Sequence, residues 1–253
     1  MSINFSTLQG LTIPRGVVTQ ISDASGRVIW AAGGKVVLTV EKITSDTYAG
    51  ETTYTGESFI LLDIYPKTNG TVKVTYGGLT KTITDTSGAE KPNAQRVFFG
   101  TFNGVSDSVT TPASGKLTID GDYYAFGQSA FDTQSKSNMG GNNQCILSIN
   151  DWGIVTEIPP YAFKYIVNKE KPDHIPKMTS VTIPESITSI GSQAFFQHTS
   201  LTELFMLATT PPTLGENAFN QTTFPIIVPK GCGATYKVAE GWSKYADRIT
   251  EAT

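Results

Sequence analysis

The sequence predicts a mainly β protein with short helices, in which a β-sandwich-like N-terminal domain is followed by a short solenoid with a C-terminal capping helix. Three observations predict this class. The chain is rich in threonine, valine and tyrosine, which favour strands, and its 24 glycines favour turns. A frame of small and apolar residues recurs through the second half of the chain. An apolar stripe at helical spacing follows the last recurrence.

Residues 1–35 are expected to form a separate N-terminal segment of two short strands around an Ala-Ser-Gly turn, with Trp30 as an anchor. The pattern "IP.G.V..I.D..GR..W" resembles N-terminal segments of tail and virion proteins of bacteriophages and prophages. It is carried by Ile13, Pro14, Gly16, Val18, Ile21, Asp23, Gly26, Arg27 and Trp30. The resemblance implies a segment that docks onto other virion or tail subunits, or that assembles the chain into a homotrimer.

Residues 36–116 are expected to form a β-sandwich of the immunoglobulin-like kind. Runs such as "SFILLDIYP" and "GTVKVTYGG" have strand character and are separated by turns rich in Gly and Asn. Asn69-Gly70 between two such runs indicates a β-hairpin. Turns recur about every ten residues, as in antiparallel sandwiches. The Cys-Trp-Cys pattern of true immunoglobulin domains is absent, and modules of this sort usually serve as spacers or binding platforms.

Residues 117–253 contain the recurring frame, which is clearest in "SVTIPESITSIGSQAFF" (residues 180–196). Its apolar positions are Ile183, Ile187, Ile190 and Phe195. The same frame aligns on three further phenylalanines, so that the four lie 32, 32 and 24 residues apart: Phe131, Phe163, Phe195 and Phe219. One turn cannot bury its own apolar face, whereas a stack of four turns can. The frame therefore predicts a solenoid with these side chains inside.

The motif "IP..I..IG..AF......L..L" in this frame resembles the BspA-type leucine-rich repeats of bacterial surface proteins. It is carried by Ile183, Pro184, Ile187, Ile190, Gly191, Ala194, Phe195, Leu201 and Leu204. The closing stretch from "TTPPTLGENAF" onwards is similar to the end of many such proteins. The resemblance covers about residues 117–253. It implies binding to surfaces and partners, with no general catalytic machinery.

A capping helix is expected over residues 234–249, because a solenoid must cover its open apolar end. Apolar residues there recur at intervals of three or four and so share one helical face. This stripe consists of Tyr236, Ala239, Trp242, Tyr245 and Ile249.

Bulk properties exclude several functions. The net charge of −3 leaves no basic stripe to neutralise phosphates, so no nucleic-acid partner is expected. No apolar run is long enough to span a membrane. The start of the chain has no signal-peptide character, which favours synthesis in the host cytoplasm and final localisation in a virion. A bacterial cell-surface location is the alternative.

No catalytic residue, cofactor or metal ligand is expected. Cys145 and Cys232 lie far apart in the sequence and are interpreted as free thiols. His174 lies in a proline-flanked insert, and His198 lies where the repeat turns.

Aromatic and amide side chains in the early solenoid form the candidate binding surface. An aromatic ring offers a flat apolar face and an amide offers hydrogen bonds, a combination that suits sugar or protein recognition. The candidates are Trp152, Tyr124, Tyr161, Tyr165 and Asn143. Trp152 precedes the frame position Val155 in a short insertion and is therefore the main candidate for exposure.

The leading functional hypothesis is a non-catalytic phage tail or virion-associated protein whose solenoid recognises a glycan or protein of the host bacterial surface. The alternative is a bacterial cell-surface adhesin of the BspA type. A carbohydrate-active enzyme is a third hypothesis, although no residue pattern points to one.

Overall fold

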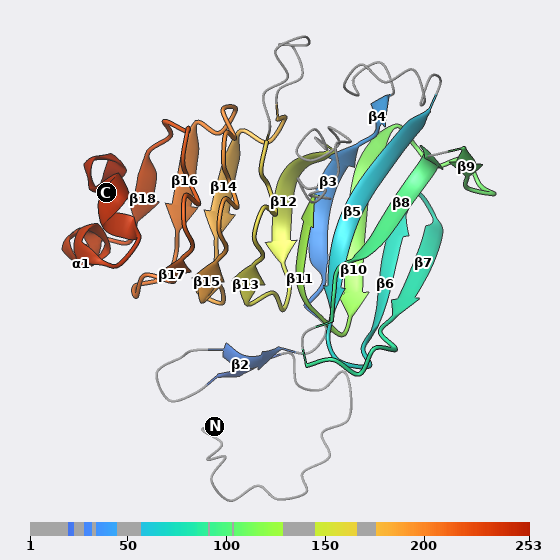
Figure 1. The fold of residues 1–253 in the computed structure, drawn as a ribbon, viewed down its shortest axis with the longest axis horizontal. Coiled ribbons are helices and arrows are strands. Elements are labelled where there is room, and N and C mark those ends of the chain that lie inside the picture. Colours follow the sequence, from blue (N-terminus) through green and yellow to red (C-terminus); the bar gives the residue numbers. More distant parts are fainter. Residues whose placement is uncertain are drawn as a thin grey trace, which may run out of the picture.

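The computed structural model describes residues 20–22, 28–31, 34–44, 57–90, 92–102, 104–128, 145–165 and 176–253. It confirms a mainly β chain (Figure 1). Near the N-terminus, β1 (Gln20–Ser22) and β2 (Val28–Ala31) pair antiparallel, with Ile21 opposite Trp30. The other residues of the virion-like pattern lie outside the described residues: Ile13, Pro14, Gly16, Val18, Asp23, Gly26 and Arg27.

The described residues between 34 and 152, here named the two-sheet unit, form two antiparallel sheets. The first sheet has the order β12 (Ile146–Trp152), β3 (Val36–Glu41), β10 (Ser114–Gly121), β6 (Thr71–Tyr76) and β7 (Leu79–Thr84). The second has the order β11 (Tyr123–Gln128), β5 (Ser58–Pro66), β8 (Gln95–Phe102) and β9 (Val105–Ser106), with β4 (Ile43–Thr44) paired to β5. Alternate residues of β3 are buried, as expected for a strand with period two. β5 is buried on both faces, with Ile60, Leu62 and Ile64 in the core that it shares with β3 and with Phe59 and Leu61 in a smaller cluster.

The predicted domain boundary between residues 116 and 117 is wrong, because it falls inside β10. In the stretch 119–131, which matches the repeat frame, residues 119–121 and 123–128 belong to strands of the two-sheet unit instead. Ile119 pairs with Val36 and Val74 in the first sheet, and Phe126 lies opposite Ile64 in the second. Strands that bury alternate side chains can place apolar residues at the same spacings as the repeat frame does. Phe131 itself lies outside the described residues.

Residues 153–253, here named the stacked-turn unit, carry two parallel sheets (Figure 1). One has the order β14 (Ser180–Ile183), β16 (Glu203–Met206), β18 (Ile226–Val228) and β19 (Ile249–Glu251). The other has the order β13 (Glu157–Ile158), β15 (Ser189–Ile190) and β17 (Thr213–Leu214). Ile158, Ile190 and Leu214 lie in register. Equivalent frame positions therefore stack on one another, one turn above the next.

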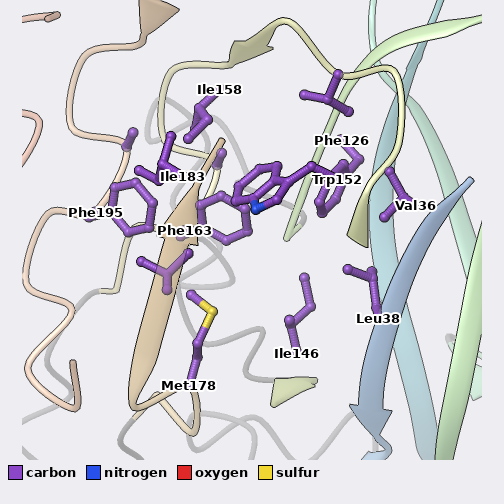
Figure 2. Packing of buried hydrophobic residues seen from close by; sticks show 14 of the residues in the cluster. Val36, Leu38, Phe126, Ile146, Trp152, Ile158, Phe163, Met178, Ile183 and Phe195 are labelled. Atoms are coloured by element: carbon purple, nitrogen blue, oxygen red, sulfur yellow. The ribbon is translucent and has the colours of Figure 1, made fainter. Parts of the chain in front are cut away.

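An aromatic column runs through the stack and into the two-sheet unit. Successive ring centroids lie 6.1, 5.0, 5.9 and 5.6 Å apart along the series Phe126, Phe163, Phe195, Phe219 and Trp242. Figure 2 shows the first part of this column beside Trp152. One continuous cluster of buried residues joins both units. The two units therefore share a core.

The turns approach so closely at Gly191 that a side chain does not fit there. A Cβ added to Gly191 would lie 2.3 Å from the backbone nitrogen of Pro160 and 2.6 Å from the carbonyl carbon of Pro159. Gly191→Ala must force the turns apart, and we expect a loss of about 1–3 kcal/mol in the free energy of unfolding, as for other overpacked sites. Urea denaturation measures it. Ser186→Ala, at an exposed position of the same turn, is the control, and equal stabilities of the two variants would contradict the prediction.

The predicted single capping helix over residues 234–249 is wrong in one respect, because two short helices close the stack. These are α1 (Gly233–Val238) and the 3₁₀ helix η4 (Trp242–Arg248). Gly241 separates the two helices and has a φ of 78°, which glycine adopts readily. A Cβ at this position would lie 2.9 Å from the Leu214 carbonyl oxygen. Tyr236 donates to the Ala208 carbonyl and Trp242 to the Pro212 carbonyl, each at 2.7 Å. Both rings are fully buried at the end of the core.

Candidate binding surface

Trp152 is buried, which corrects the prediction that it lies on an exposed surface. Its side chain is 7% exposed, and its indole N–H donates to the Thr182 carbonyl at 2.7 Å. Its ring lies 5.6 Å from Phe126 and 6.2 Å from Phe163 (Figure 2). Because β12 ends the two-sheet unit next to β14, Trp152 fills the joint between the two units.

Trp152→Phe should destabilise the protein while leaving the outer surface unchanged. The variant keeps an aromatic ring but leaves the Thr182 carbonyl without its donor, which we expect to lower the free energy of unfolding by about 1–3 kcal/mol. Thermal unfolding followed by circular dichroism measures this. A stability equal to that of the parent chain would show that the hydrogen bond contributes nothing to the joint.

The other predicted surface residues are not brought together. Tyr165 is only 2% exposed and belongs to the core, which corrects its prediction as a surface residue. Tyr124 lies half-buried on the second sheet, where its hydroxyl donates to the Pro92 carbonyl at 3.1 Å. Asn143 lies outside the described residues. Tyr161, with 40% of its surface exposed, is the one candidate that the structure shows as exposed.

Tyr161 belongs to a third face of the stack, here named the turn face, which consists of residues 160–165, 192–197 and 216–221. Backbone hydrogen bonds tie each of these turns to the next, as Phe163 N–H donates to Ala194 O at 2.7 Å and Phe195 N–H to Ala218 O at 2.8 Å. The phenylalanines and alanines of the frame point into the core from these turns. Polar and half-buried side chains lie between them.

Left-handed backbone conformation recurs at equivalent positions of the turn face. Tyr161, Gln193 and Asn217 have φ of 63°, 54° and 57°, and Gln197 and Gln221 have φ of 57° and 56°. Such conformation is uncommon in residues other than glycine. Because it recurs in register, each turn presents its side chains at these positions in the same way.

Side-chain contacts join the turns across this face. The Lys164 ammonium donates to Gln193 Oε1 at 2.8 Å and lies 5.1 Å from the Tyr161 ring centroid and 5.2 Å from that of Phe196. The Gln197 amide donates to Gln221 Oε1 at 2.5 Å. Among the described residues, no ion pair of Lys164 with a carboxylate is found. Partial burial lowers the pKa of Lys164. Sequence reasoning missed this group, apart from Tyr161.

Burial favours the uncharged forms of the Cys145 thiol and the His198 imidazole. Burial raises the pKa of the Cys145 thiol to about 12, which keeps it protonated and unreactive. Burial lowers the pKa of His198 to about 4, and neither ring nitrogen has a hydrogen-bond partner. Cys232 is a free thiol, and His174 lies outside the described residues.

In the part of the chain that the structure describes, no cluster of His, Cys, Asp or Glu could hold a metal ion. None of the helices there has the length and apolarity that crossing a membrane requires.

Residues 156–229 match the family model of the BspA type leucine rich repeat region, in six copies. The match begins at β13 and ends just after β18, so it covers the turns of the stack and none of the two-sheet unit. The chain has no match among curated proteins. This part of the chain is therefore similar to a repeat family that generally serves binding, in agreement with the resemblance of its motif.

Proposed function

We propose that the chain is a non-catalytic binding protein, and specifically a phage tail or virion-associated protein that recognises the surface of a host bacterium. In this proposal residues 153–253 are a leucine-rich-repeat solenoid, and the two-sheet unit is a β-sandwich-like spacer. The repeat match over residues 156–229 carries the binding part of the proposal, because repeats of this type are associated with surface binding. The tail role rests on the virion-like pattern near the N-terminus. The turn face supports it by offering aromatic and amide side chains on a rigid stack.

The shared core gives the spacer a mechanical role. Since buried residues run without interruption from the first sheet to the cap, the stack is held at a fixed orientation to the two-sheet unit. Residues 1–35 would attach the chain to other tail subunits or assemble it as a homotrimer. The bacterial surface glycan or protein would then bind the stacked-turn unit.

A bacterial cell-surface adhesin is the second candidate, and the repeat match favours it equally because such repeats resemble those of bacterial surface proteins. Both candidates require binding to a bacterial envelope or partner without turnover. They differ in where the chain is found. Immunogold labelling with antibodies to the chain would place it on phage particles in the first case and on intact cells in the second.

Binding is tested with the fluorescently labelled full chain on whole cells of candidate host bacteria. We expect saturable retention that unlabelled protein displaces. Periodate treatment of the cells, which oxidises sugars, should abolish retention if the receptor is a glycan, whereas protease treatment should abolish it if the receptor is a protein. Absence of saturable retention on every bacterium tested would contradict the proposal. Release of sugar fragments or peptides during incubation would contradict its non-catalytic part.

A further inference from the structure

We infer that the turn face binds an acidic polysaccharide, and that Lys164 holds its anionic group. The inference rests on the proposed function and assigns a ligand class and a place to it. The contacts of Lys164 carry the argument, together with the amides of the neighbouring turns.

Among the described residues, no carboxylate lies within ion-pair distance of the Lys164 ammonium. Its ammonium lies near two aromatic rings, at 5.1 Å from Tyr161 and 5.2 Å from Phe196, and gives one hydrogen bond to Gln193 Oε1. An ammonium has three donors, so two remain for a ligand. Partial burial has removed part of its hydration, which lowers its pKa and strengthens its attraction to an incoming anion. A carboxylate or phosphate group would supply the missing charge.

Tyr161 and the amides suit the sugar part of such a ligand. The exposed Tyr161 ring offers a flat apolar face beside the ammonium. Gln193, Gln197 and Gln221 offer amide groups, each of which can both donate to and accept from sugar hydroxyls. These residues come from successive turns, whose strands lie about 4.8 Å apart. A linear chain of sugars along the stack would therefore meet Tyr161 and Lys164 at the first turn and amide groups at the next two.

The charges on the turn face favour one orientation of an acidic ligand along the stack. Lys164 lies in the first turn, and Glu216 lies exposed in the third, where it accepts from the Asn217 amide at 3.2 Å. An anionic substituent is attracted to the first turn and repelled from the third.

The test measures binding of the full chain to polygalacturonate, to a phosphomannan and to neutral dextran by biolayer interferometry. We expect binding to at least one of the acidic polymers, weakened by added salt, and no comparable binding to dextran. Binding to polygalacturonate alone would identify a carboxylate-bearing polysaccharide, and binding to the phosphomannan alone a phosphate-bearing one. Either result supports the inference.

Lys164→Gln should weaken binding to the acidic polymer about tenfold, as expected for the loss of a charge-assisted hydrogen bond. Lys116→Gln removes the same charge from an exposed position on β10 and should leave binding unchanged. Lys164→Arg should retain most of the binding because it keeps the charge. Equal melting temperatures of the three variants would show that the stack is intact.

Equal binding by Lys164→Gln and Lys116→Gln would overturn the inference, and so would equal binding of dextran or no binding of any probe. The cell assay separates this failure from that of the proposed function. If Lys164→Gln is retained on host cells as well as the parent chain is, the surface-binding function stands and the turn face is not its site. If the parent chain itself is not retained on cells, the proposed function fails.

Discussion

Phe195→Ala is expected to lower the free energy of unfolding by about 3–5 kcal/mol, the range found for buried phenylalanines. Phe195 is fully buried at the middle of the aromatic column, where its ring lies 5.0 Å from Phe163 and 5.9 Å from Phe219. Alanine would leave a cavity that the turns above and below cannot close, because backbone hydrogen bonds fix their separation.

Urea denaturation followed by tryptophan fluorescence measures this loss. Trp152 and Trp242 lie in the same core, at the two ends of the stacked turns, so both should report one transition. Phe196→Ala is the matched control, because it removes the same side chain from the next position, where the ring is only partly buried. Equal losses for the two variants would contradict the placement of Phe195 in the column, as would an unchanged stability of Phe195→Ala.

The phenylalanine column could be predicted because the frame combines burial with a fixed spacing. Phe163, Phe195 and Phe219 each follow a small residue and precede a polar turn, and the structure buries all three. The pattern could not separate a turn of the stack from an antiparallel strand pair. In the stretch 119–131, the strands β10 and β11 bury Ile119 and Phe126 by simple alternation. Strand pairing, which decides the difference, depends on distant partners such as Val36 and Ile64.

The candidate surface was harder to predict, because exposure depends on what the fold places nearby. Trp152 lies in an insertion relative to the frame, which predicts a loop, but β12 brings its ring against Phe163 and the Thr182 carbonyl. The amino-acid sequence does contain a pattern that indicates the turn face. Polar or aromatic residues occupy the position two before each frame phenylalanine, namely Tyr161, Gln193 and Asn217. Aligning the outward positions of the repeats, as well as the buried ones, would have found them.

Acidification should destabilise the folded protein through His198. The ring is fully buried, both nitrogens lack hydrogen-bond partners, and the nearby Ser200 hydroxyl is likewise buried without one. A charged imidazolium at this position would be poorly solvated. Burial therefore lowers the pKa of His198 from 6.5 to about 4.

The sign of the effect follows from proton binding. Above pH 6.5 the histidine is neutral in both the folded and the unfolded chain, and its contribution to stability does not change with pH. As the pH falls from 6.5 towards 4, the unfolded chain binds a proton that the folded chain does not bind, so stability is lost. The full loss is about 3 kcal/mol, of which about 2 kcal/mol falls above pH 5.

Urea denaturation at a series of pH values between about 7 and 5 measures this loss, in a range where ordinary carboxyl groups remain mostly ionised. His198→Leu removes both unpaired nitrogens and should make the stability nearly constant across the range. His174→Leu, which removes the other histidine of the chain, should retain the pH dependence of the parent. If the pH dependence is instead lost in His174→Leu and persists in His198→Leu, the buried imidazole is not the acid-sensitive group. If His198→Leu alone removes it, the stack carries a single histidine that weakens it in acid, next to the turn face that we propose as the binding surface.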